Sequence, residues 1–369
     1  MRKLRVKRAP RQSTSKSSTD HPHDSNFEPR PAFKGRPRCL FTCPLRSMNT
    51  QHQQQNIPGE LLERLGTIYD PEVAGLVEAS FASLPPLSFR VIGNDGARSG
   101  VVEELRESGF APEPVPWCKG AFVARGGTRH GLQDTVSWSE GRIFIQSLSS
   151  MAAAVALEVE PGHHVLDLCA APGGKTAMLG LDQRGRGVLL ANDRSRKRLA
   201  SLRSVLDQHG VSHAELQNRT GESYGGTHRD CFDRVLVDAP CSGEAMLRQD
   251  DVAGCEDWST RRIRRLASQQ ARLLTAGLRT LKPGGILVYS TCTYAPEENE
   301  GVLDKVLRRI DVPVEIDPLP MFLPEGLPGL REWEGVSYDT SIRHGLRLVP
   351  GGDCTGFFIA RLRRSSSDS

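Results

Sequence analysis

The chain has 369 residues, of which 38% are hydrophobic and 25% charged, and its formal net charge is +4. This length allows two or three domains with a sizeable core, and the composition is that of an ordinary globular protein. The mildly basic balance permits a nucleic-acid partner without establishing one. No run of about 18 apolar residues occurs, so we expect no transmembrane helix. The nine cysteines are an odd number spread along the chain, which favours a reducing, cytoplasmic location over a disulfide framework.

Residues 1–57 are predicted to be a disordered basic extension, because Met1–Ser18 is rich in Lys, Arg and Ser and contains no acid. Three explanations stay open for its first 47 residues. They are an RNA-binding arm, an organellar transit peptide, or a segment that is not translated because synthesis starts at Met48. Cys39 and Cys43 lack a second ligand pair nearby, so we expect no zinc site there and no metal elsewhere.

Residues 58–140 are predicted to form a small α+β region. The spacing of Leu61, Leu62, Leu65 and Ile68 predicts a helix over Pro58–Tyr69. A strand is expected at Leu87–Val91, and an amphipathic helix at Gly100–Ser108.

From residue 141 to 364, strand patterns alternate with helix patterns, which predicts an α/β domain with a mainly parallel sheet, followed by a short tail at 365–369. The predicted strands are His164–Leu168, Val188–Asn192, Ala214–Asn218, Phe232–Asp238, Gly285–Ser290, Val312–Ile316 and Gly356–Leu362. The predicted helices are Thr176–Gly180, Arg196–Gln208, Ser259–Leu281 and Glu298–Arg309, with Glu297, Glu298 and Glu300 capping and charging the start of the last one.

Chemically active side chains follow three of these strands. Cys241 lies in Asp238–Gly243, Cys292 lies in Ser290–Thr293, and Val165–Thr176 runs from a strand through a glycine turn into a helix. Because the carboxyl ends of strands in an open sheet face the ligand crevice, these motifs predict two reactive thiols beside a nucleotide-like cofactor. The alternative for each cysteine is a small buried hydrophobe.

The turn itself ends in Gly174-Lys175-Thr176, like a phosphate-binding P-loop. That pattern needs a glycine five residues before Gly174, where this chain has Cys169, and Pro172 lies inside the would-be loop. The sequence therefore argues against nucleoside triphosphate hydrolysis.

With these motifs the chain resembles the S-adenosylmethionine-dependent RNA cytosine-5 methyltransferases, the Fmu/Sun/NSUN family, and most closely the bacterial RsmF type that acts on small-subunit rRNA. The resemblance runs from about Pro58 to about Arg364. It is also carried by Pro116–Cys118, Gly141–Ser147, Ala191–Asp193, Leu281–Gly285, Pro296–Glu300 and Gly356–Ala360. It implies a Rossmann-like, seven-stranded class I methyltransferase domain over 141–364, preceded by an RNA-binding domain over 58–140. In the family's Arg-Val-Asn block this chain has Arg90-Val91-Ile92.

The resemblance implies a site for S-adenosylmethionine. Asp193, one residue after the second predicted strand, is expected to accept hydrogen bonds from the ribose hydroxyls, as the acid of dinucleotide folds does. Its alternative role is a helix N-cap. Thr220 stands where the family usually has an acid beside a glycine. The whole expected set is Cys169, Ala170, Ala171, Pro172, Gly173, Gly174, Lys175, Asp193, Thr220 and Asp238.

The catalytic roles are also implied by the resemblance. Addition of a thiolate to C6 makes the C5 of cytosine nucleophilic, so covalent catalysis splits one hard step into easier ones. Cys292 is the expected C6 nucleophile, and Cys241 the thiol that takes the C5 proton or assists product release. Asp238 is expected at the N3/N4 edge, and Lys175 is expected to position base or phosphate. DNA cytosine methyltransferases use a Pro-Cys thiol, which keeps the reverse assignment open.

The expected substrate is RNA, foremost rRNA, acted on by a monomer. A tRNA cytosine-5 methyltransferase is the alternative enzyme. A catalytically weak RNA-binding or ribosome-assembly factor is the alternative class, motivated by Thr220 and Ile92.

Overall fold

The computed structural model describes residues 56–84, 86–93 and 95–366. Almost all of the predicted N-terminal extension, including Cys39 and Cys43, lies outside these ranges. Ile57 is described and is buried. In the described part of the chain, no helix combines the length and apolarity that crossing a bilayer requires.

The N-terminal elements form a small antiparallel sheet with helices. The four strands have the order β2-β3-β1-β4. On α1, Leu61, Leu65 and Ile68 of the predicted apolar face are buried, and Leu62 is partly buried. They belong to a core cluster that includes Trp258 and Tyr294, so α1 packs on residues from much later in the chain. The elements are α1 (Gly59–Ile68), α2 (Pro71–Ser80), β1 (Ser88–Val91), α3 (Asp95–Glu107), β2 (Ala111–Pro114), β3 (Ala121–Arg125), α4 (Arg129–Gln133), α5 (Val136–Ser139) and β4 (Ile143–Ile145).

The larger part alternates strands with helices, as the sequence predicts. Its first half contains α6 (Leu148–Ala156), β5 (His164–Asp167), α7 (Gly174–Gln183), β6 (Val188–Asn192), α8 (Arg196–Gln208), β7 (Ala214–Gln217), η1 (Gly221–Ser223), α9 (Tyr224–Thr227) and β8 (Phe232–Asp238). Its second half contains η2 (Glu244–Met246), α10 (Val252–Asp257), α11 (Thr260–Thr280), β9 (Leu281–Thr291), α12 (Glu300–Leu307), β10 (Val314–Asp317), β11 (Leu327–Pro328), β12 (Glu332–Trp333), β13 (Val336–Ser337), η3 (Thr340–His344), β14 (Leu346–Leu348) and β15 (Phe357–Arg364).

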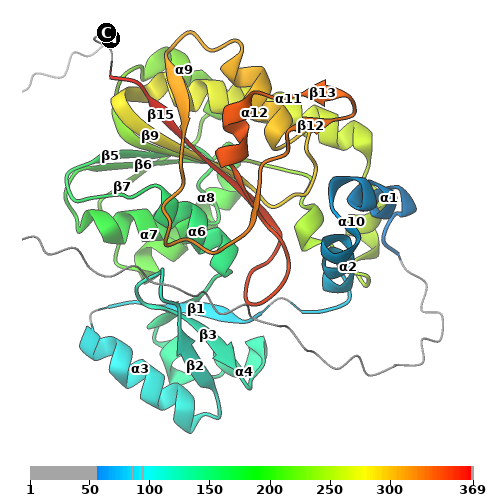
Figure 1. Ribbon diagram of the computed structural model, residues 1–369. Coiled ribbons are helices and arrows are strands. Elements are labelled where there is room, and N and C mark those ends of the chain that lie inside the picture. Colours follow the sequence, from blue (N-terminus) through cyan, green and yellow to red (C-terminus); the bar gives the residue numbers. More distant parts are fainter. Residues whose placement is uncertain (1–55, 85, 94, 367–369) are drawn as a thin grey trace, which may run out of the picture. The chain divides into compact units, whose positions relative to one another are not determined.

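The main sheet contains all seven predicted strands, with β11 and β14 added at one edge. Its order is β11-β14-β15-β9-β8-β5-β6-β7, and β10 pairs with β15. The strands from β5 to β9 are parallel to one another, whereas β15 runs antiparallel to β9. Figure 1 shows β9 and β15 side by side. Numbered in chain order, the seven predicted strands have the spatial order 3-2-1-4-5-7-6.

Both faces of this sheet are covered by helices, which explains why its strands are apolar nearly throughout. Val165 packs with residues of α6, α7 and α8 on one face. Its neighbour Leu166 packs with residues of α11 and α12 on the other. This two-sided burial leaves the carboxyl ends of the strands as the place where polar side chains collect.

Candidate active site

The two predicted catalytic cysteines meet at the carboxyl ends of adjacent strands. In the parallel pair β8 and β9, Asp238 is opposite Ser290. The chain then runs a few residues further on each side to Cys241 and Cys292, so both reach the same edge. Their Sγ atoms lie 3.1 Å apart. The backbone N–H of Cys292 also donates to Cys241 Sγ at 3.3 Å.

The surroundings make the two sulfurs unequal. The adjacent sulfur of Cys292, followed by burial, raises the pKa of Cys241 well above its ordinary value. The Cys292 N–H acts in the opposite direction, but it is the weaker influence. An S–H on either sulfur can donate to the other.

Asp238, the last residue of β8, forms an ion pair with Lys175. Lys175 Nζ lies 2.8 Å from Asp238 Oδ2, and Ser290 Oγ donates to Asp238 Oδ1 at 2.7 Å. Lys175 is the second residue of α7, and its Nζ lies 5.4 Å from the centre of the Phe357 ring. The lysine side chain is 12% exposed and the aspartate 32% exposed. The carboxylate is thus fixed in direction and still open to a ligand.

A cavity of about 170 Å³ extends from Asp238 along the glycine turn. Its lining includes Phe144, Gln146, Asp167, the whole of Cys169–Lys175 and Asp238. A Cβ at Gly174 would lie 3.0 Å from Phe144 Cε1, so a side chain there would crowd the wall. Gly173 has φ +120°, a conformation that L side chains rarely adopt. The turn needs both glycines.

Asp167 forms an unusual part of this cavity wall. It is 1% exposed. Its Oδ2 accepts a hydrogen bond from Thr176 Oγ1 at 2.7 Å, whereas its Oδ1 has no hydrogen-bond partner among the described residues. Burial raises the pKa of Asp167 to about 7. The site therefore holds a buried carboxyl oxygen with an unfilled acceptor position, which the sequence motif alone did not indicate.

A second cavity, of about 210 Å³, lies on the other side of Cys169, which lines both. Asp193 lines it and is 2% exposed. Its carboxylate accepts from the N–H groups of Ala171 at 3.3 Å and Ser195 at 2.8 Å, and it pairs with Arg198 at 3.2 Å. The helix-cap alternative for Asp193 is wrong, because Ser195 is the N-cap of α8.

Thr220 is exposed and is not among the residues that line either cavity. Glu222, two residues later, lines the second cavity together with Gln269 and Leu273 of α11. Sequence reasoning missed Glu222, although Gly221-Glu222 is itself an acid beside a glycine. The sequence could not predict that Gln269 and Leu273 line this cavity, because α11 is distant in the sequence from the other lining residues.

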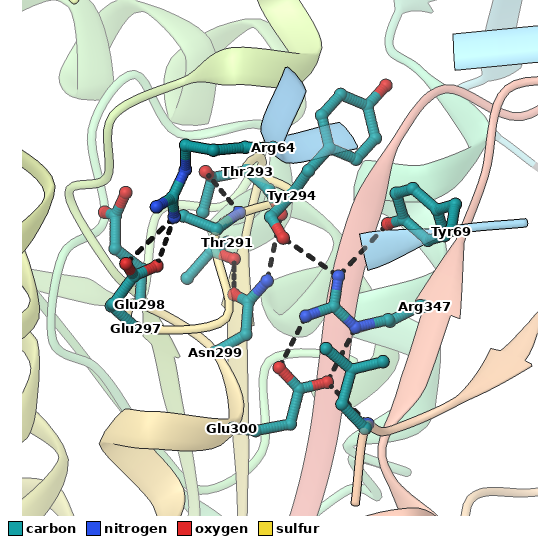
Figure 2. Close-up of polar contacts among 12 residues, drawn as sticks. Arg64, Tyr69, Thr291, Thr293, Tyr294, Glu297, Glu298, Asn299, Glu300 and Arg347 are labelled. Carbon is teal, nitrogen blue, oxygen red and sulfur yellow. Dashed lines mark hydrogen bonds and ion pairs between the residues drawn. The ribbon is translucent and has the colours of Figure 1, made fainter. Parts of the chain in front are cut away.

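Glu300 charges the first turn of α12 as expected, but Glu297 and Glu298 do not cap the helix. The N-cap of α12 is Asn299, without a side-chain cap hydrogen bond, and only Glu300 lies in its first turn. Glu297 pairs with Arg64 at 2.7 Å and Glu300 with Arg347 at 2.5 Å, as Figure 2 shows. Glu298 accepts from the Ser242 N–H at 3.0 Å and from Gln270 Nε2 at 2.7 Å. The run is therefore a junction of long-range contacts.

Comparison with known proteins agrees with this geometry. The model of the 16S rRNA methyltransferase RsmB/F family matches residues 154–363. The chain belongs to this family. RsmB/F membership confirms that the protein is a methyltransferase, as its motifs predicted.

Two relatives of this chain are named for different RNA substrates. A tRNA (cytosine(49)-C(5))-methyltransferase of Pyrococcus abyssi is 36% identical over 266 residues, which are 71% of this chain and 83% of that protein. A ribosomal RNA small subunit methyltransferase F of Vibrio parahaemolyticus is 34% identical over 322 residues, which are 86% of this chain. The match spans 65% of the Vibrio protein's length.

Solved structures confirm the Rossmann-like fold. A methyltransferase homolog from Pyrococcus horikoshii has a TM-score of 0.68 and 33% identity, covering 84% of this chain and all of that one. NSun6 from the same organism, solved with SFG, has a TM-score of 0.70 and covers 84% of this chain and 99% of that one. Its identity is 20%, so this likeness concerns the fold alone.

Proposed function

We propose that this protein transfers a methyl group from S-adenosylmethionine to C5 of cytosine in RNA, in the cytoplasm. The observation that carries the proposal is the pair of sulfurs 3.1 Å apart just after β8 and β9, together with the Lys175–Asp238 ion pair that lines the first cavity. Two reactive thiols must stay reduced to act, which fits a reducing compartment.

The residues present fit the cofactor. Gly173 and Gly174 allow close approach of the turn, and Asp167 Oδ1 offers an unfilled acceptor to an amino group. Asp193 retains acceptor positions for ribose hydroxyls, because a carboxylate has about four lone-pair sites. We assign the adenine-side contact to Glu222, the acid beside Gly221 that lines the second cavity, in place of Thr220. When bound, S-adenosylmethionine supplies a methyl group activated by a positively charged sulfur.

The chain's own side chains then divide the chemistry. The thiolate of Cys292 adds to C6 of the cytosine and makes C5 nucleophilic. Asp238 accepts from the base's N3/N4 edge, held in direction by Lys175 and Ser290. Cys241 afterwards removes the proton from C5. The assembled thiols and carboxylate argue against a catalytically weak assembly factor.

Small-subunit rRNA is the proposed substrate, supported by the family model and by the extent of the match to the Vibrio protein. The tRNA alternative is supported by the Pyrococcus abyssi relative. We assign positioning of the RNA to the region 58–140. A target base inside a helix must be flipped to reach the sulfurs, which is cheaper in a loop.

The test uses purified protein, tritiated S-adenosylmethionine, and small-subunit rRNA and tRNA in separate reactions. We expect transfer by the wild type, loss of transfer in Cys292→Ala, and a trapped covalent RNA adduct in Cys241→Ala. Transfer that survives in Cys292→Ala would contradict the assignment of the thiols. Transfer to tRNA alone would select the alternative substrate.

A further inference from the structure

Two buried side chains, Gln270 and Glu298, hold the backbone on both sides of Cys241. Gln270 Nε2, from α11, donates to Pro240 O at 2.8 Å. The Ser242 N–H, on the other side of the cysteine, donates to Glu298 Oε2 at 3.0 Å. Gln270 Nε2 also donates to the same Glu298 oxygen at 2.7 Å, which closes a clamp around Cys241.

This clamp is costly to build. Both side chains are 0% exposed. The hydrogen-bond partners of Glu298 are a backbone amide and a side-chain amide, with no cation among them in the described part of the chain. Burial raises the pKa of Glu298 to about 7. A neutral residue would fill this place at lower cost, since a buried carboxylate without a cation is destabilising.

The effect of Glu298 on the pKa of Cys241 suits removal of the C5 proton better than addition to C6. The Glu298 carboxylate is among the charges that raise the pKa of Cys241. A raised pKa makes a sulfur a poorer thiolate source but a stronger base. Cys292, which must add to C6, is not clamped by these two residues.

We propose that Glu298, held by Gln270, is a positioning residue for the second half of the reaction, in which Cys241 removes the C5 proton. In that step the Cys241 thiolate takes the proton from C5. The C5–H electron pair becomes the C5–C6 double bond, and the C6–S bond breaks to return Cys292 as a thiolate. No oxidant or reductant is needed. The inference rests on the proposed function.

The experiment compares wild type, Glu298→Gln, Cys241→Ala and, as a matched control, Glu297→Gln. The control changes the neighbouring carboxylate, which pairs with Arg64 instead. Each protein is mixed with substrate RNA and tritiated S-adenosylmethionine, and the covalent protein–RNA adduct is measured under denaturing conditions. We expect Glu298→Gln to accumulate adduct about tenfold or more above wild type, because small misplacements of a catalytic group are this costly. Single-turnover methyl incorporation should stay near wild type, as should both readouts in Glu297→Gln.

A purely structural role for Glu298 would lower incorporation and adduct together, and that result would overturn the inference. If Glu298→Gln forms no more adduct than wild type and turns over normally, the inference is overturned as well. Gln270→Met removes the two hydrogen bonds that Gln270 makes to Pro240 O and to Glu298, and leaves the carboxylate and its bond from the Ser242 N–H in place, so it decides the matter if Glu298→Gln does not fold. Cys241→Ala separates the two proposals, because its failure to trap adduct would count against the proposed function itself.

Discussion

The sulfurs of Cys241 and Cys292 lie 3.1 Å apart, although 51 positions separate them in the chain. A disulfide needs an S–S distance of about 2 Å, so a shift of about 1 Å would suffice to link them. We predict that diamide, a two-electron thiol oxidant, joins the pair and abolishes methyl transfer, and that dithiothreitol restores it. Mass spectrometry of linked peptides checks this. The Cys292→Ala variant should give no link, and retained activity with both thiols still open to alkylation would contradict the prediction.

The buried ion pair between Arg347 and Glu300 should dominate the stability of the region drawn in Figure 2. Their side chains are 2% and 0% exposed, and Arg347 also donates to Tyr294 O at 2.9 Å. We predict that Arg347→Met lowers the free energy of unfolding by about 3–5 kcal/mol, because it leaves a buried carboxylate unpaired. Urea denaturation measures the effect.

Two further variants sharpen that measurement. The double change Arg347→Met with Glu300→Leu should recover much of the loss, since no buried charge then remains. Arg308→Met breaks the pair between the exposed Arg308 and the buried Asp304, and it should lower the free energy of unfolding less, because Asp304 keeps the hydrogen bond from the Asp339 N–H. If Arg347→Met lowers the free energy of unfolding no more than Arg308→Met does, the buried pair does not stabilise the fold.

Stability should fall as pH rises from about 4 to 7, partly because of Asp167. Burial raises its pKa from an ordinary 3.8 to about 7, so between these values the folded state holds a proton that the unfolded state has lost. Its contribution is present below the lower value and is lost, up to about 4 kcal/mol, as pH approaches the upper one. Asp182 and Glu298 act in the same direction. Urea unfolding of Asp167→Asn should show a flatter pH dependence, whereas the exposed Asp311→Asn should match wild type.

Affinity for S-adenosylmethionine should depend on Glu222 and not on Thr220. Glu222 lines the second cavity, whereas Thr220 lines neither. We predict that Glu222→Gln raises the dissociation constant about tenfold, the usual worth of a hydrogen bond to a charged group. Isothermal titration calorimetry checks this, with Thr220→Ala as the control. Equal affinities in the two variants would remove Glu222 from the site.

Elements with a strong local pattern could be predicted from the sequence. The bounds of β6, α8 and β8 agree with expectation residue by residue. The meeting of the Cys241 and Cys292 motifs followed from one rule, that parallel strands end at a common edge. The strands β11 and β14 were missed because two and three residues are too short to show a period.

Contacts between distant segments could not be predicted in the same way. The acids at Glu297–Glu300 looked like a helix start, because a local pattern carries no information about partners such as Arg64 or Arg347. Glu222 was missed because the turn η1 redirects the chain just after Gly221. In each case the partner is chosen by tertiary packing.

The two cysteine-bearing loops are also joined to each other by side chains other than the cysteines. Ser242 Oγ and Thr293 Oγ1 lie 2.8 Å apart, and Thr293 Oγ1 in turn donates to Glu244 Oε2 at 2.8 Å. Anyone who builds chimaeras between members of this family therefore has to transplant both loops as a matched set. If only one loop is exchanged, the hydrogen bonds between the loops are lost, and the hybrid would fail for reasons unrelated to substrate choice.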